Sequence, residues 1–205
     1  KGVDFGGIYP KSIPYFISML VILLMLSLDI ILAKRFFSPE LAGKYAVLSM
    51  LGKMIFFGTM AIGKAMFPLT SERHDNHKNP FDLFKKSVLI ISFLCIISIM
   101  IYGFFPKFII FVLYGNQYIE MAPFLVYSGI ALSFLAFSNL ILIYGLSVNA
   151  IKKPQYLFVF LFLGIALLYL FHNTILEYIL AFMLSNVIMF IGVFSLLIRW
   201  RSKKG

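Results

Sequence analysis

The sequence predicts an all-α integral membrane protein, a bundle of six transmembrane helices. Of the 205 residues, 61% are hydrophobic and only 13% are charged, whereas about a quarter of the residues in a soluble domain are charged. No stretch shows the alternating polarity of a strand, and lipid offers no hydrogen-bond partners to an open backbone, so the spans must be helices. A helix crosses the hydrocarbon core with about 20 apolar residues, and six segments suit that length.

We expect the spans at residues 13–33, 44–67, 87–105, 123–148, 155–171 and 178–198. A polar lead, residues 1–12, precedes them and a basic tail, residues 201–205, follows. The apolar part of residues 107–118 is too short to span, so this segment is expected to be interfacial or re-entrant.

Prolines mark several span ends, and Pro68 is expected to close the second span. The polar run that follows, residues 69–86, is read as a solvated loop. It contains His74 and His77, whose spacing of three would suit a metal ion on a helix. The Asn79-Pro80 pair and the mixed charge favour a loop, so no metal site and no cofactor are expected.

Lysine and arginine residues are distributed unevenly between the two sides of the predicted bundle. Twelve lie in the lead, the loops after spans two and four, and the tail, against four on the other side. The positive-inside rule then places both ends in the cytoplasm, as an even number of spans requires. The chain starts with Lys1 and shows no secretory leader before the first span, so we expect that it lacks its true start.

The second span carries two lysines, Lys53 and Lys64, inside an apolar run. A lysine near the middle of a bilayer costs a few kcal/mol and usually faces a bundle interior or a hydrated cavity. Eleven helical residues place the two about 20° apart around the axis and about 16 Å apart along it. Ser49 extends the same face by one turn. Lys64 lies near Pro68, from where its ammonium group can reach the headgroups.

Asp29 is the acidic counterpart, about one turn from the end of the first span. Because adjacent spans run antiparallel, Asp29 and Lys53 can meet. Two interpretations remain open. The first is a structural ion pair of Asp29, either with Lys53 or with Lys34 at the interface. The second is a hydrated cavity, lined by Asp29 and Lys53, that receives an anionic ligand. Asn139, in the fourth span, either joins helices by hydrogen bonds or contacts the same ligand.

Motifs of catalysis and of nucleic-acid binding do not stand out. The chain has no nucleophile motif with a base, no carboxylate pair within one span, no HExxH sequence and no glycine-rich phosphate loop. Its single cysteine, Cys95, has no partner within the chain and excludes a thiolate metal cluster. We expect neither an enzyme nor a nucleic-acid partner.

Residues 29–68 resemble the start of the C-terminal half of the polysaccharide and O-antigen flippases, within the superfamily of multidrug, oligosaccharidyl-lipid and polysaccharide exporters. In that family an aspartate-containing helix ends in Ala-Lys, and a Pro/Glu turn with AG-x-Y opens the next helix, which ends in proline. The matching residues are Asp29, Ala33, Lys34, Pro39, Glu40, Ala42, Gly43, Tyr45 and Pro68. The later runs LYGNQYIEMAPFL and GLSVNAIKKPQ also resemble family elements, in the correct order.

The resemblance implies one lobe of a two-lobe flippase in the bacterial cytoplasmic membrane, with a second, N-terminal lobe as its partner. It also implies alternating access and transfer of an anionic lipid-linked oligosaccharide, carried on undecaprenyl diphosphate, to the outer leaflet. The lysine face would then suit the diphosphate, since a buried ammonium group offsets part of the cost of removing a phosphate from water. The candidate cavity residues are Lys53, Asp29, Lys64, Ser49 and Asn139.

Besides a non-transporting structural remnant, which the missing start allows, two alternatives remain. The first is a small-molecule or drug antiporter of the same superfamily, which would favour buried acids over buried lysines. The second is a membrane enzyme of glycan assembly, such as a polymerase or an acyltransferase. Such an enzyme would be expected to show conspicuous arginine, histidine or acidic side chains near its outer loops, and these loops are sparse in them.

Overall fold

The computed structural model describes residues 9–151 and 153–202, and none of these residues forms a strand. The helices are α1 (Tyr9–Phe36), α2 (Pro39–Asp75), α3 (Phe81–Phe104), α4 (Pro106–Tyr114), the 3-10 helix η2 (Asn116–Phe124), α5 (Leu125–Ser147), the short 3-10 turn η3 (Pro154–Tyr156), α6 (Leu157–Leu170) and α7 (Ile175–Ser202). Most of the predicted lead and part of the predicted tail lie outside the described residues.

Five of the helical segments are long and apolar enough to cross a membrane. They are Ile13–Phe36, Pro39–Asp75, Phe81–Phe104, Asn116–Ser147 and Ile175–Ile198. The predicted membrane bundle of helices is therefore confirmed, and the chain is a multi-pass membrane protein. The sixth apolar segment, Pro154–Leu170, is shorter. At 1.5 Å per residue it reaches about 25 Å, against a hydrocarbon core of about 30 Å, so the number six stays a prediction.

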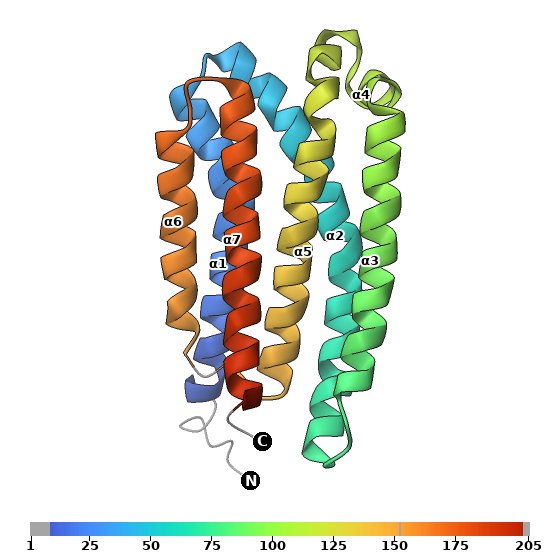
Figure 1. Ribbon diagram of the computed structural model, residues 1–205, viewed down its shortest axis with the longest axis vertical. Helices are drawn as coiled ribbons and strands as arrows, with labels where there is room; N and C mark the ends of the chain where they lie inside the picture. The colour runs from blue at the N-terminus through green and yellow to red at the C-terminus, as the bar shows by residue number, and fades with distance from the viewer. Residues whose placement is uncertain (1–8, 152, 203–205) are drawn as a thin grey trace.

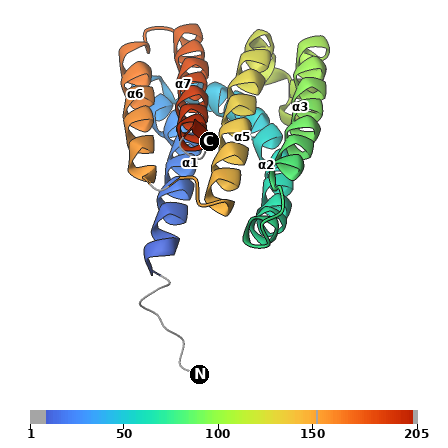
Figure 2. The ribbon, with the colours of Figure 1, turned by 60° about the horizontal axis from the view of Figure 1, so that its bottom comes forward.

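The helices α1, α2, α3, α5, α6 and α7 alternate in direction along the chain, and the start of α1 lies at the same end of the bundle as the end of α7 (Figure 1). Viewed from that end, α5 lies between α7 and the pair formed by α2 and α3 (Figure 2). Most of α5 is buried, whereas most of α3 is exposed. The core therefore sits around α5, and α3 and α6 lie at the two edges.

Helix α2 does not end at Pro68 but continues to Asp75. Pro68 lies on an exposed face of the helix, where its ring displaces no neighbouring helix and the loss of one backbone hydrogen bond is tolerated. The expected loop at residues 69–86 is accordingly short. His74 belongs to the last turn of α2, and His77 lies in the connection to α3 with a φ of 55°.

The segment expected to be interfacial forms α4 and the beginning of η2, which join α3 to α5 at the end of the bundle opposite the start of α1 (Figure 1). Helix α4 has nine residues, too few to span. Its Phe108 and Phe111 side chains are exposed. Its depth in a membrane stays a prediction.

Helices α2 and α5 approach each other closely at Gly52. A Cβ atom at this position would lie 2.5 Å from Ser128 Oγ and 3.0 Å from the Ser128 carbonyl oxygen. The Ser128 hydroxyl itself donates a 2.7 Å hydrogen bond to the Leu48 carbonyl oxygen. The absence of a side chain at Gly52 thus permits an interhelical hydrogen bond, a combination common where membrane helices pack tightly.

Substitution of Gly52 tests this packing. We expect Gly52→Ala to lower the free energy of unfolding by about 2 kcal/mol, because the added methyl group must displace Ser128 or its hydrogen bond. The matched control is Gly58→Ala in the same helix, where a Cβ atom would meet nothing within 4 Å. Unfolding in mixed micelles, followed by circular dichroism, measures both. Equal stability of the two variants would contradict the close approach at Gly52.

Candidate functional site

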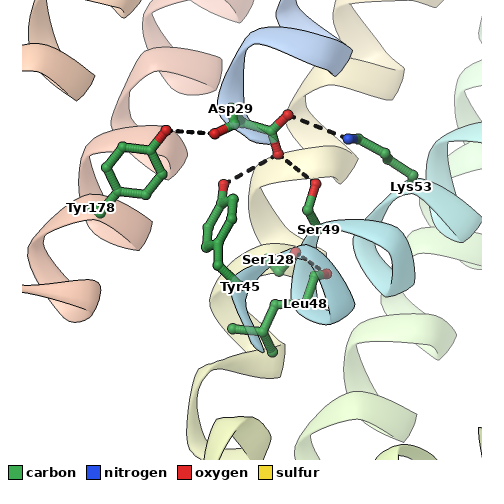
Figure 3. A network of polar contacts seen from close by, with 7 residues as sticks. All are labelled: Asp29, Tyr45, Leu48, Ser49, Lys53, Ser128 and Tyr178. Carbon is green, nitrogen blue, oxygen red and sulfur yellow. Dashed lines mark hydrogen bonds and ion pairs between the residues drawn. The ribbon is translucent and has the colours of Figure 1, made fainter. Parts of the chain in front are cut away.

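A wholly buried carboxylate on α1 forms the centre of the candidate site (Figure 3). Asp29 accepts hydrogen bonds from three side chains of α2: Tyr45, Ser49 and Lys53. The Tyr45 hydroxyl lies 3.2 Å from Oδ2, and the Lys53 ammonium nitrogen lies 3.3 Å from Oδ1. The Ser49 hydroxyl donates to the same oxygen as Tyr45. Because these three residues are spaced by four, they share one face of α2.

Helix α7 joins the network through Tyr178. Its hydroxyl donates a 2.6 Å hydrogen bond to the backbone carbonyl oxygen of Asp29, and its ring packs edge-on against the ring of Tyr45, with centroids 5.1 Å apart. Tyr178 is itself fully buried, so its hydroxyl needs a partner within the protein. The network therefore connects α1, α2 and α7 around one carboxyl group.

The two oxygens of Asp29 are held differently. Oδ2 receives hydrogen bonds from both Tyr45 and Ser49, whereas the contact recorded for Oδ1 is with Lys53 (Figure 3). An isolated buried carboxylate would cost several kcal/mol, and this set of donors offsets that cost. Loss of the Lys53 contact would leave the other oxygen still bound by two hydroxyl groups.

Lys53 lies at the rim of this cluster. Its side chain is 13% exposed, while that of Asp29 is 0% exposed. An ammonium group has three N–H donors, and within the part of the chain that the structure describes only the one to Asp29 is recorded. The Lys53 ammonium group is therefore able to donate to a second anion without leaving the cluster.

The structure brings together three of the five predicted site residues: Asp29, Ser49 and Lys53. The predicted ion pair is confirmed, and the partner of Asp29 is Lys53 rather than Lys34. Lys64 is exposed on the same side of α2 as Lys53, outside the network. Asn139 is buried in α5, and none of the recorded hydrogen bonds joins it to Asp29. A ligand-binding role for these residues stays a prediction.

The sequence analysis did not assign Tyr45 and Tyr178 to the site. Tyr45 lies four residues before Ser49 and eight before Lys53, so the helical period could have identified it. Tyr178 is separated from Asp29 by 149 positions, and no local pattern points to that contact.

The exposed side of α2 next to Lys53, here named the α2 open face, differs from an ordinary lipid-facing surface. It combines lysine and small residues with apolar ones: Met50, Met54, Phe57, Gly58, Ala61, Lys64 and Ala65. The exposed side of α3 consists instead of large apolar residues, among them Leu89, Phe93 and Met100. Large apolar side chains suit lipid, while small residues permit close helix packing and lysine needs a polar surrounding.

The ion pair can be tested through the stability of charge-removing variants. We expect Lys53→Met to lower the free energy of unfolding by about 3 kcal/mol, because the Asp29 carboxylate would remain buried without its cation. Asp29→Asn should cost less, since the rim position lets Lys53 reach other partners. The double variant should be more stable than Lys53→Met alone, and additive losses measured by chemical unfolding would refute a direct pair.

The comparison with known families agrees with the resemblance of residues 29–68. The family described as Polysaccharide biosynthesis protein matches residues 7–123, which is more than half of the chain and includes α2 with the whole face that binds Asp29. Comparisons with curated proteins and with solved structures give no significant match. With its helical membrane fold and this match, the chain belongs to the family of polysaccharide biosynthesis proteins.

Proposed function

We propose that the chain is the C-terminal lobe of a flippase that carries a lipid-linked oligosaccharide across the bacterial cytoplasmic membrane for surface polysaccharide export. The observation that carries the proposal is the Lys53 ammonium group, held by a buried carboxylate at the rim of the bundle. Membership of the polysaccharide biosynthesis family supports a passenger of this chemical class. The proposed activity is transport, not catalysis.

The passenger's diphosphate supplies the anion in this mechanism. A diphosphate is poorly solvated by hydrocarbon, and an ammonium group inside the membrane offsets part of that cost. Lys53 can donate to a phosphate oxygen with the N–H groups that Asp29 does not use. If a phosphate displaced Asp29 from Lys53, only the Oδ1 atom of Asp29 would lose its partner. The Oδ2 atom would keep its hydrogen bonds from Tyr45 and Ser49.

We assign the second lobe to the α2 open face. Its small residues, Gly58, Ala61 and Ala65, suit close approach of another helix, and Lys53 and Lys64 lie along the same side. An N-terminal lobe placed there would enclose both lysines in a cavity between the lobes. The glycan would then pass along α2, and alternate opening of the two ends would move it between leaflets.

Export by the full-length protein tests the role of Lys53. We expect Lys53→Ala to abolish delivery of the glycan to the cell surface, measured by surface polysaccharide staining in a strain lacking the chromosomal copy. Lys53→Arg keeps the positive charge and should retain part of the export. The reason is electrostatic: without a cation at this depth the diphosphate has no compensating charge.

The matched control is Lys107→Ala, which removes an exposed lysine from α4, outside the network. Both variants are compared at equal membrane abundance, determined by immunoblotting. If Lys53→Ala exported the glycan normally, the role of Lys53 would be limited to helix packing. The main support for a diphosphate passenger would then be lost.

The proposed orientation, with both ends in the cytoplasm, is tested by cysteine labelling. In a Cys95→Ala background, Asn79→Cys in the exposed α2–α3 connection should react with an impermeant maleimide only after the membrane is opened. Gln117→Cys, exposed in η2 at the other end of the bundle, should react in intact spheroplasts. The reverse labelling pattern would invert the topology.

A further inference from the structure

The hairpin formed by the end of α2 and the start of α3 reaches beyond the ends of α5 and α7 (Figure 1). Helix α2 has 37 residues, which corresponds to about 55 Å. A bilayer with its headgroup regions is about 40–45 Å thick. Since the hairpin is the part of α2 that reaches beyond its neighbours, we expect it to lie in a headgroup layer, where lipid phosphates are found.

A cavity of about 240 Å³ lies in this hairpin between α2 and α3. Its walls are formed by Leu69, Glu72, Arg73, Asn76, Lys78 and Leu83. The two leucines are on the side of the cavity nearer the bundle, because α2 descends past Leu69 toward Arg73 and α3 ascends past Leu83. The cavity is thus apolar toward the membrane interior and polar toward water, as a phospholipid is.

The polar part of the cavity carries two cations, Arg73 and Lys78. Neither forms an ion pair in the part of the chain that the structure describes, where all recorded pairs involve Lys44 or Lys53. Glu72 contributes one negative charge and lies beyond ion-pair distance of both. Asn76 adds an amide donor to the cavity wall.

We propose that this cavity binds the phosphate headgroup of an anionic membrane lipid, with Arg73 and Lys78 on the phosphate and one acyl chain against Leu69 and Leu83. Guanidinium and ammonium groups form strong charge-assisted hydrogen bonds to phosphate, and basic pockets between membrane helices recognise anionic headgroups. The apolar half of the cavity favours a lipid over a soluble phosphate ester. The site is independent of the proposed transport function, and its lipid is not the transported glycan.

Native mass spectrometry of the full-length protein with titrated lipid tests the site. Phosphatidylglycerol is the probe, and phosphatidylcholine is the zwitterionic reference. We expect the wild-type protein to prefer phosphatidylglycerol and Arg73→Gln/Lys78→Gln to lose about tenfold in affinity for its first bound molecule. Lys85→Gln/Lys86→Gln removes the same charge from the same hairpin but outside the cavity walls, and should lose less than about twofold.

If the two double variants lost the same affinity for phosphatidylglycerol, the lipid would bind a diffuse basic surface, and the proposed pocket would be refuted. Absence of a preference in the wild-type protein would overturn it too. Displacement of the lipid by millimolar glycerol phosphate would assign the cavity to soluble phosphate esters and refute the lipid. If the first double variant does not fold, Lys78→Gln alone, exposed in the connection, should still lose about threefold. Unchanged affinity in Lys78→Gln would refute the proposal.

Discussion

The buried pair of Asp29 and Lys53 is the constraint on which the arrangement of the helices depends, because lipid offers no water to replace either partner. One segment of α2 makes the surrounding contacts. Ser49 and Lys53 bind α1, the Leu48 carbonyl accepts from Ser128 of α5, and the Leu51 carbonyl accepts from Tyr102 of α3 at 2.7 Å. Helices α1, α3 and α5 are thus fixed against less than two turns of α2. A shift of α2 by one turn would break every one of these bonds.

Part of this site could be predicted from sequence because its residues follow the helical period. Lys53 and Ser49 share a face of α2, and Asp29 lies at a comparable depth in the preceding span, so an antiparallel pair of helices brings them together. The same period could have added Tyr45. Tyr178 could not be found in this way, because its contact with Asp29 depends on how α7 packs, which no local pattern specifies. The continuation of α2 past Pro68 depends likewise on tertiary surroundings, since the proline faces outward.

The two sides of α2 differ in how firmly they are held. One side is bound through side-chain hydrogen bonds to three helices, whereas the α2 open face has small residues, a lysine and no partner among the described helices. Lys53 lies at the boundary between the two sides, so its ammonium group belongs to the rigid network and is still accessible. Tyr45 and Ser49 would keep Asp29 in place if the Lys53 ammonium group changed its partner.

The cations along α2 differ in whether an ion pair is recorded for them. Lys44, near its start, lies 2.9 Å from both Glu40 and Glu120, and Lys53 is paired with Asp29. Lys64 and Arg73 have no recorded ion pair within the described residues. Arg73 lies between the acidic residues Glu72 and Asp75, whereas Lys64 has no acidic residue near it in the sequence. Lys64 is therefore the cation with the least local compensation, and it lies toward the end of α2 that the charge bias predicts to be cytoplasmic. In the proposed flippase, an anionic headgroup arriving from that side would meet the unpaired Lys64 first and the paired Lys53 later. Competition with Asp29 would then weaken its binding as it advances, which favours release on the opposite side.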